Sequence, residues 1–138
     1  MIQTKYFRVQ HEELLKIATN IIQELDKDKL QTSPANVLSL LQQIRNKLKL
    51  HLAMEDEKIY PRLLLHSKES MRTLGKQFVE EMGGLSKVVQ RYFTLWEETG
   101  NIKSNPDDFI KETKEIFTAL QKRIDKEEKE LYSVIDAL

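Results

Sequence analysis

Two short segments of the chain pair a basic side chain with a glutamate four residues later. In the segment LKLHLAMEDEKIYPRLL, His51 precedes Glu55, and in the segment RIDKEEKELY, Arg123 precedes Glu127. Residues four apart lie on the same face of a helix, one turn from each other. Imidazole nitrogens and carboxylate oxygens are common ligands of iron, zinc and manganese. The first pair can therefore bind a metal ion, whereas the guanidinium of the second is a permanent cation that cannot.

These pairs need helices to position them, and apolar residues repeat at helical spacing in four segments of the chain. We expect helices over about residues 6–28, from Ser33 to Leu63, from after Ser67 to near Gly100, and from Asn105 to Val134. Ser33 and Asn105 are suited to cap two of these helices, and Pro61 should kink the second. Short connections favour antiparallel neighbours. We therefore predict an all-α fold, an antiparallel up-down-up-down four-helix bundle, with one domain over residues 1–138.

The polar residues on the apolar stripes fall at one level of this bundle. In antiparallel neighbours, equivalent levels mirror each other through the midpoint of the connection. Reflection through the three connections gives four residues at a common level, namely His11, His51, Met82 and Arg123. Glu55 and Glu127 follow within one turn, and the fourth stripe then continues to Leu131 and Val134. Scattered polar residues would not gather in one slice, so the sequence predicts a site there.

The order and spacing of these residues resemble the hemerythrin-like family of HHE cation-binding domains over nearly the whole chain. The segment HLAMEDEKIYP is the most specific match. The family pattern has a histidine on helix one, His-x-x-x-Glu on helix two, a histidine on helix three and His-x-x-x-Glu on helix four, and these ligands hold two irons. The resemblance implies metal-ligand roles for four residues, His11, His51, Glu55 and Glu127.

Two positions depart from the family pattern. The chain has no histidine after His66, so Met82 stands at the ligand position of helix three and Arg123 at that of helix four. Thioether sulfur is a weak ligand for iron, and arginine cannot ligate a metal. In the family, the histidines of these two helices complete the shell of one iron. We therefore interpret the ligand set as degenerate, without a normal diiron, oxygen-binding centre.

Two hypotheses describe the residual site. In the first, the four ligands carried over from the family bind one iron or other divalent metal ion, and two neutral imidazoles with two carboxylates make that site charge-neutral. In the second, no metal binds, and the guanidinium of Arg123 bridges Glu55 and Glu127. Charge favours the second hypothesis, because an ion beside Arg123 leaves excess positive charge in a low dielectric. Nearby acids such as Glu81 can change that balance.

Composition and charge restrict the partners and the location. The 138 residues include 22 Lys+Arg and 22 Asp+Glu, and this balance argues against nucleic acid or an anionic membrane as a partner. The sequence has no cysteine, no apolar run long enough for a membrane span and no signal-peptide core at its start, so we expect a cytoplasmic protein. It has no Ser/His/Asp set and no glycine-rich phosphate loop, so we expect no enzymatic activity.

We therefore predict a degenerate hemerythrin-like domain with a regulatory, sensory or structural role. The alternative is a metalloprotein whose residual mononuclear or altered dinuclear iron site senses oxygen or nitric oxide. A protein partner or a homodimer is a third hypothesis, which no exposed apolar stripe of the sequence favours.

Overall fold

The computed structural model describes residues 4–98 and 100–138, and its regular elements are all helical. The predicted all-α fold is therefore confirmed. The elements are α1 (Thr4–Gln23), α2 (Lys27–Thr32), α3 (Ala35–Lys58), α4 (Tyr60–Leu64), α5 (Glu69–Glu97), α6 (Asn101–Ser104), α7 (Pro106–Lys126), the π-helix η1 (Glu127–Tyr132) and α8 (Ser133–Ala137). None of the helices in these two ranges combines the length and the apolar character needed to cross a membrane.

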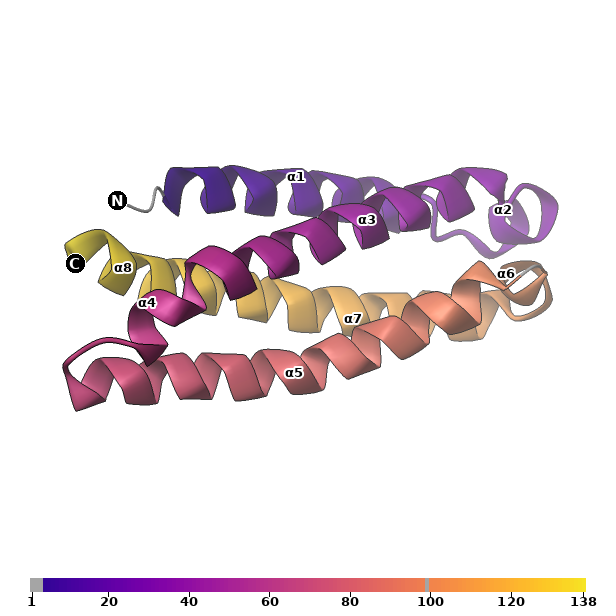
Figure 1. Ribbon diagram of the computed structural model, residues 1–138. Coiled ribbons are helices and arrows are strands. Elements are labelled where there is room, and N and C mark those ends of the chain that lie inside the picture. The colour runs from indigo at the N-terminus through magenta and orange to yellow at the C-terminus, as the bar shows by residue number, and fades with distance from the viewer. Residues whose placement is uncertain (1–3, 99) are drawn as a thin grey trace.

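The long helical rods of Figure 1 are α1, α3, α5 and α7, the last of which continues through η1 and α8. The start of α1 and the end of α8 lie at one end of the molecule, whereas the short helices α2 and α6 lie at the other. This arrangement brings residues far apart in the sequence to the same level.

Two of the four expected helices are interrupted. The first ends at Gln23, and the separate helix α2 follows, capped by the side chain of Asp26, which accepts a hydrogen bond from the backbone N–H of Lys29 at 2.9 Å. The second breaks at Ile59, between α3 and α4. This break lies two residues before Pro61, because proline lacks an N–H and its ring obstructs the preceding turn. The predicted kink at Pro61 is confirmed.

The predicted N-cap at Ser33 is wrong, whereas Asn105 is the N-cap residue of α7, as predicted. The side chain of Ser33 makes no capping hydrogen bond to α3, because Ser33 instead ends α2 with its backbone N–H on the carbonyl of Lys29. The side chain of Asn105 makes no capping hydrogen bond to α7 either, although Pro106 is the first residue of that helix, as expected. Rigid proline geometry at the first turn of α7 suits the start of a helix without such a cap.

A glycine allows close contact between α4 and α5. A Cβ added at Gly75 would lie 2.9 Å from the Cβ of Leu63, so the backbone approaches α4 more closely than any other residue would permit. Gly83 and Gly84 lie further along the same helix, and a Cβ added at either would meet no described atom within 4 Å. Neither of these two glycines therefore permits a close helix approach.

The core consists of two apolar clusters with a polar layer between them. The larger cluster includes Leu14, Leu48, Val89 and Leu120. The smaller includes Phe7, Ile59, Phe78 and Leu131. The buried side chains that fall between them along the rods are His11, His51, Glu55, Arg123 and Glu127. The prediction that the polar residues share one slice of the molecule is confirmed.

Candidate metal site

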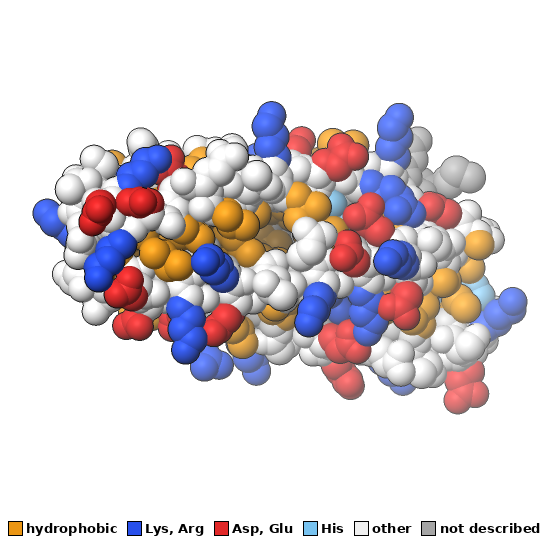
Figure 2. Space-filling model, turned by 180° about the vertical axis from the view of Figure 1, so that it is seen from behind, with side chains coloured by type: hydrophobic (Ala, Val, Ile, Leu, Met, Phe, Trp, Pro, Cys, Tyr) orange, Lys and Arg blue, Asp and Glu red, His pale blue; other side chains and the backbone are white. Residues whose placement is uncertain are grey.

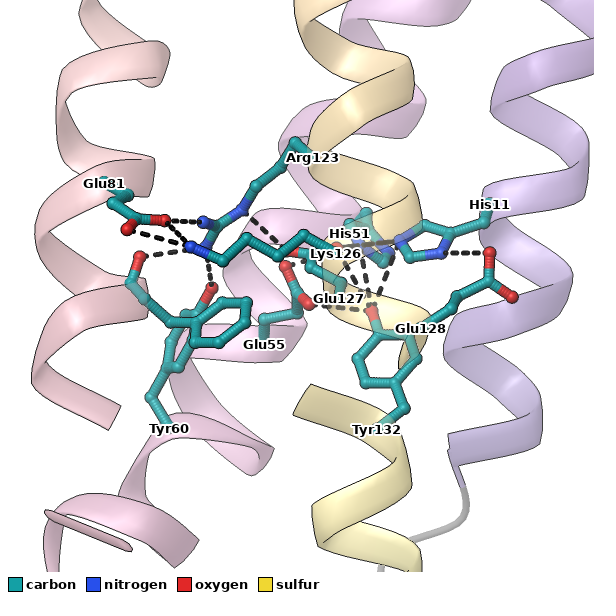
Figure 3. Close-up of polar contacts among 11 residues, drawn as sticks. His11, His51, Glu55, Tyr60, Glu81, Arg123, Lys126, Glu127, Glu128 and Tyr132 are labelled. Carbon is teal, nitrogen blue, oxygen red and sulfur yellow. Dashed lines mark hydrogen bonds and ion pairs between the residues drawn. The ribbon is translucent and has the colours of Figure 1, made fainter. Parts of the chain in front are cut away.

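Three buried side chains from three helical segments bring their donor atoms to one point (Figure 3). His11 comes from α1, His51 from α3 and Glu127 from η1. The Nε2 atom of His11 lies 3.1 Å from Nε2 of His51 and 2.9 Å from Oε1 of Glu127. The third distance, from His51 Nε2 to Glu127 Oε1, is 3.6 Å. Imidazole nitrogens and a carboxylate oxygen so arranged form a candidate site for one cation.

The other ring nitrogen is hydrogen-bonded in His51, whereas in His11 it faces a carboxylate without a hydrogen bond among the described residues. His51 Nδ1 lies 2.7 Å from Oε1 of the buried Gln10, and because an amide oxygen only accepts hydrogen bonds, Nδ1 is the donor. His11 Nδ1 lies 3.4 Å from a carboxylate oxygen of Glu128. With the proton on Nδ1, each neutral ring presents the lone pair of Nε2 to the common point. Metal-binding histidines are held in this way.

Glu55 and Tyr132 lie beside this cluster in the same layer. Glu55 Oε1 is 3.3 Å from His51 Nε2, and Oε2 accepts a hydrogen bond of 2.7 Å from the hydroxyl of Tyr132. Within the described chain, Glu55 Oε1 has no hydrogen-bond partner although it is buried. A buried carboxylate oxygen without a partner is costly, and a cation nearby lowers that cost. Glu55 therefore fits the surroundings of a positive ion.

The proximity of these groups shifts their pKa values. Burial lowers the pKa of His51, but hydrogen bonds and charges from Glu127 and Glu55 outweigh burial and raise it to about 9. Burial raises the pKa of Glu127, but hydrogen bonds and charges from His11 and His51 lower it to about 2. Burial, with repulsion from Glu127, raises the pKa of Glu55 against the opposing bond to His51. The layer thus favours an anionic Glu127 with positive charge beside it.

Arg123 lies on the other side of Glu127. Its Nε is 3.3 Å from Glu127 Oε2, the oxygen that does not face the histidines. Its Nη1 is 3.2 Å from Glu81, and its Nη2 donates to the backbone carbonyl of Phe78 at 2.9 Å and lies 3.4 Å from the hydroxyl of Tyr60. The guanidinium also lies 4.7 Å from the centre of the Phe78 ring. Glu127 therefore joins the histidine cluster to the guanidinium.

The prediction that Arg123 bridges Glu55 and Glu127 is wrong in one half. The contact with Glu127 is present, but among the described residues Arg123 makes no ion pair or hydrogen bond with Glu55. The physical reason is that the nitrogens of the guanidinium already have partners in Glu81, the carbonyl of Phe78 and the hydroxyl of Tyr60. The guanidinium instead turns toward α5, where Glu81 supplies its second carboxylate.

Met82 is buried on α5 and lines a cavity of ≈ 30 Å³ beside the cluster. The polar and sulfur-bearing residues that line the same cavity are His11, His51, Met82, Arg123 and Glu127. The four residues predicted to share one level therefore surround one space, which confirms the mirror argument. The rest of the lining is apolar, from α1, α3 and α7, and Figure 2 shows a hollow among hydrophobic side chains on the face seen from behind.

Sequence reasoning missed Tyr132 because it assumed the regular period of an α-helix. That period continues the fourth stripe from Glu127 to Leu131 and Val134. The π-helix η1 adds a residue to the turn, so Tyr132 and Ile135 are buried and Val134 is only partly so. A signal was present: the segments EDEKIY and EEKELY each place a tyrosine five residues after a site glutamate. The orienting amide of Gln10 had no comparable signal.

A comparison with protein families agrees with this geometry. The family model described as the hemerythrin HHE cation-binding domain matches residues 3–135. The chain belongs to the hemerythrin HHE family. Comparison of this hemerythrin domain with the curated proteins and with the solved structures gave no match.

The residues of this hemerythrin domain fit one cation. Two oriented imidazole nitrogens and a carboxylate oxygen face a common point, and the partnerless oxygen of Glu55 lies close by. At the positions that the family pattern assigns to histidines of helices three and four, Met82 and Arg123 supply no uncharged nitrogen or oxygen donor. The donor set of the layer is therefore concentrated on His11, His51 and Glu127.

Proposed function

We propose that this hemerythrin domain has lost a normal diiron oxygen-binding centre, binds one iron or other divalent metal ion, and has a regulatory or sensory role. The observation that carries the proposal is the convergence of His11 Nε2, His51 Nε2 and Glu127 Oε1 within 2.9–3.6 Å. A hydrogen bond at Nδ1 orients the imidazole of His51 for ligation, and Nδ1 of His11 faces the carboxylate of Glu128 at 3.4 Å. A bound ion supplies concentrated positive charge and, in the case of iron, redox chemistry.

In this proposal a side chain stands where the second ion of the family would lie. Arg123 is always charged, and its Nε already lies 3.3 Å from Glu127 Oε2. A second ion there would share Glu127 with a guanidinium and meet a like charge in a buried layer. Met82 offers only a thioether, which is a poor ligand for iron. These two residues are the support for a degenerate site.

Glu81 removes the charge objection to a retained ion. Its carboxylate lies 3.2 Å from Nη1 of Arg123, so the guanidinium has its own anionic partner on α5 in addition to Glu127. Glu55 and Glu127 then balance a divalent ion beside two neutral imidazoles. A metal-free layer, in which a protonated His51 replaces the ion, is the competing hypothesis.

The apolar cavity supports a sensory role. Its ≈ 30 Å³ exceeds the roughly 10–15 Å³ that one water needs, and its wall is mostly aliphatic and aromatic. Such a space accepts a small uncharged molecule next to His11 and His51 without desolvating a charge. Oxygen or nitric oxide is the class of signal that we propose for the metal-bound form. We propose no enzymatic activity for it.

We further propose that residues 1–138 form one domain and that the four long rods are an antiparallel up-down-up-down four-helix bundle. The support is that consecutive helices pack on each other, α1 on α3 and α4 on α5. The short helices α2, α4, α6 and α8 lie between the long rods in the chain or extend them. The lack of cysteine supports a cytoplasmic location, where thiols stay reduced and disulfides are rare.

Calorimetric titration of the chelator-treated protein with Zn²⁺ tests the proposal. We expect one ion per chain, and we expect His51→Ala to weaken binding by about 100-fold or more. His66→Gln is the matched control, since His66 lies outside the layer, and it should bind like the parent. Lack of binding by the parent would favour the metal-free layer. Two ions bound with similar affinity would contradict the loss of the second position.

A further inference from the structure

The hydroxyl of Tyr132 is a fourth donor atom at the point where the three candidate ligands meet. Its oxygen lies 3.3 Å from His11 Nε2, 3.4 Å from His51 Nε2 and 3.5 Å from Glu127 Oε1. The other three distances among these atoms are 3.1, 2.9 and 3.6 Å. Six similar distances among four points define a nearly regular tetrahedron. Figure 3 shows the four side chains converging from three directions.

The centre of this tetrahedron lies at bonding distance from every corner. An edge of about 3.3 Å corresponds to about 2.0 Å from the centre to each corner, and zinc binds histidine nitrogen and carboxylate oxygen at about 2.0–2.2 Å. Tetrahedral coordination by nitrogen and oxygen is the usual geometry of such sites. The four atoms are therefore placed as ligands of a single small ion would be.

With neutral histidine rings, this convergence needs a cation to stabilise it. When His51 is neutral, its proton lies on Nδ1, which donates to Gln10, so Nε2 offers a lone pair. When the ring is protonated, Nε2 also donates, toward Glu127 and Glu55. The single proton of the Tyr132 hydroxyl is directed to Glu55 Oε2 at 2.7 Å. The oxygen of Tyr132 therefore presents lone pairs to the histidines and to Glu127. Electron-pair donors that face one another are favourable around a cation and unfavourable without one.

The helix that carries Tyr132 departs from regular geometry at this place. The segment Glu127–Tyr132 is a π-helix, and its wider turn brings residues five apart onto one face. Glu127 and Tyr132 are five apart, and both are buried with their oxygens 3.5 Å from each other. In a regular α-helix, five residues turn the side chain well away from the starting face. The irregular turn thus places a phenol at the site.

We infer that Tyr132 is the fourth ligand of the metal ion, so that His11, His51, Glu127 and Tyr132 form a tetrahedral site with one phenolate. The inference rests on the proposed function, since it needs the ion that the other three hold. On binding, the O–H bond of Tyr132 breaks, an oxygen–metal bond forms, and the proton passes to Glu55 Oε2. Two anionic ligands then balance a divalent ion. Phenolate is also a hard ligand that suits ferric iron.

Tyr60 is a matched control for this inference. It follows Glu55 by five residues, as Tyr132 follows Glu127, and it is also buried. Its hydroxyl lies 3.4 Å from Nη2 of Arg123 instead of facing the candidate ligands. Replacement of either tyrosine by phenylalanine removes one hydroxyl and leaves the volume of the ring in place.

The experiment titrates the chelator-treated full chain with Co²⁺ and follows its visible absorption, which is much stronger in four-coordinate than in six-coordinate sites. We expect a strong spectrum for the parent and for Tyr60→Phe. Tyr132→Phe should bind Co²⁺ at least about tenfold more weakly and with a changed spectrum. The same proteins loaded with Fe³⁺ should show a phenolate charge-transfer band in the parent and in Tyr60→Phe, and none in Tyr132→Phe.

Equal Co²⁺ affinity and an equal ferric band in Tyr132→Phe and the parent would overturn the inference. The proposed function would then still stand, because it needs only the other three ligands. Lack of Co²⁺ binding by the parent would overturn both. If Tyr132→Phe does not fold, the folded Tyr60→Phe protein decides alone: a ferric phenolate band supports Tyr132 as ligand, and its absence overturns the inference.

Discussion

The two halves of the polar layer differ in the cation that faces their shared carboxylate. In the half formed by α1 and α3, His11 and His51 present two Nε2 atoms to one oxygen of Glu127. In the half formed by α5 and α7, Met82 and Arg123 stand at the matching positions, and the guanidinium binds the other oxygen. In our proposal, the carboxylate of Glu127 therefore binds an exchangeable metal ion with one oxygen and the permanent cation of Arg123 with the other.

The halves otherwise follow the same plan. Each has a glutamate followed five residues later by a buried tyrosine, and each tyrosine reaches across to the opposite half. The hydroxyl of Tyr132 donates to Glu55, whereas that of Tyr60 lies against Arg123. In our proposal, the difference between the halves comes from two side chains, Met82 and Arg123, which replace a metal position of the family by an ion pair within a common frame.

Removal of the side-chain cation should have the largest effect on stability. Arg123→Ala leaves Glu127 without the guanidinium and removes the side-chain donor that the carbonyl of Phe78 accepts from. Breaking a buried ion pair from one side costs about 3–5 kcal/mol, and we expect a loss of that size in urea unfolding at neutral pH with chelator present. Stability should partly recover as the pH falls, because protonation of a carboxylate relieves the repulsion that remains.

Lys126→Ala is the control for this prediction. Lys126 binds the same Glu81 at 2.7 Å, but its side chain is 36% exposed, so its removal should cost less than about 1 kcal/mol. Similar losses for the two variants would show that the guanidinium is no more than a surface charge.

In the half formed by α1 and α3, the charge of His51 should make the stability of the protein depend on pH. In chelator, the pKa of His51 is raised from 6.5 to about 9, so its stabilising contribution is complete below pH 6.5 and is lost as the pH rises through 9. The loss should be about 3 kcal/mol. His51→Gln should remove this alkaline slope, and His66→Gln should keep it. An unchanged slope in His51→Gln would assign the effect to another group.

Restoring histidine at position 123, as in the family pattern, should make the second half of the layer more like the first in its affinity for a metal ion. Arg123→His recreates His-x-x-x-Glu and removes the repelling charge, so affinity for a divalent ion should rise about tenfold, or about 1.4 kcal/mol. A second ion should still not bind, because Met82 remains a thioether. Calorimetry with Zn²⁺ measures both values, and an affinity equal to that of the parent would count against the role of Arg123 as the excluding charge.

The smallest expected effects concern the backbone of α5 beside Met82. Gly83 and Gly84 have open space where an added methyl group would lie, so Gly83→Ala and Gly84→Ala should each stabilise the protein by about 0.5–1 kcal/mol. Gly75→Ala should destabilise it, because its Cβ would lie 2.9 Å from that of Leu63. Thermal unfolding of the three variants distinguishes these signs. A stabilised Gly75→Ala would refute the close approach of α4 and α5.

Helical spacing and antiparallel reflection were sufficient to predict the level of the site. They brought His11, His51, Met82 and Arg123 to one cavity, because rise per residue is constant along straight helices. They could not predict the partners of Arg123, since a long side chain can turn to either neighbour and Glu81 projects from a third helix. Its expected bridge to Glu55 was therefore wrong.

The extra residue of the π-helix was the other limit of the sequence. A stripe extrapolated at 3.6 residues per turn assigns Val134 to the core, whereas the wider turn buries Tyr132 and Ile135. Whether a π-helical turn is stable depends on the tertiary contacts of its side chains, and the local sequence does not determine those contacts. The repeated spacing from glutamate to tyrosine was the one usable clue.

The stoichiometry of bound metal tests the central claim most directly. The parent protein, purified without chelators from cells supplied with iron, is measured by native mass spectrometry together with elemental analysis and visible absorption. We predict one metal ion per chain and no absorption from an oxo-bridged iron pair, because Arg123 excludes the second ion. Two tightly held irons per chain with an oxo-bridged charge-transfer band would contradict the account.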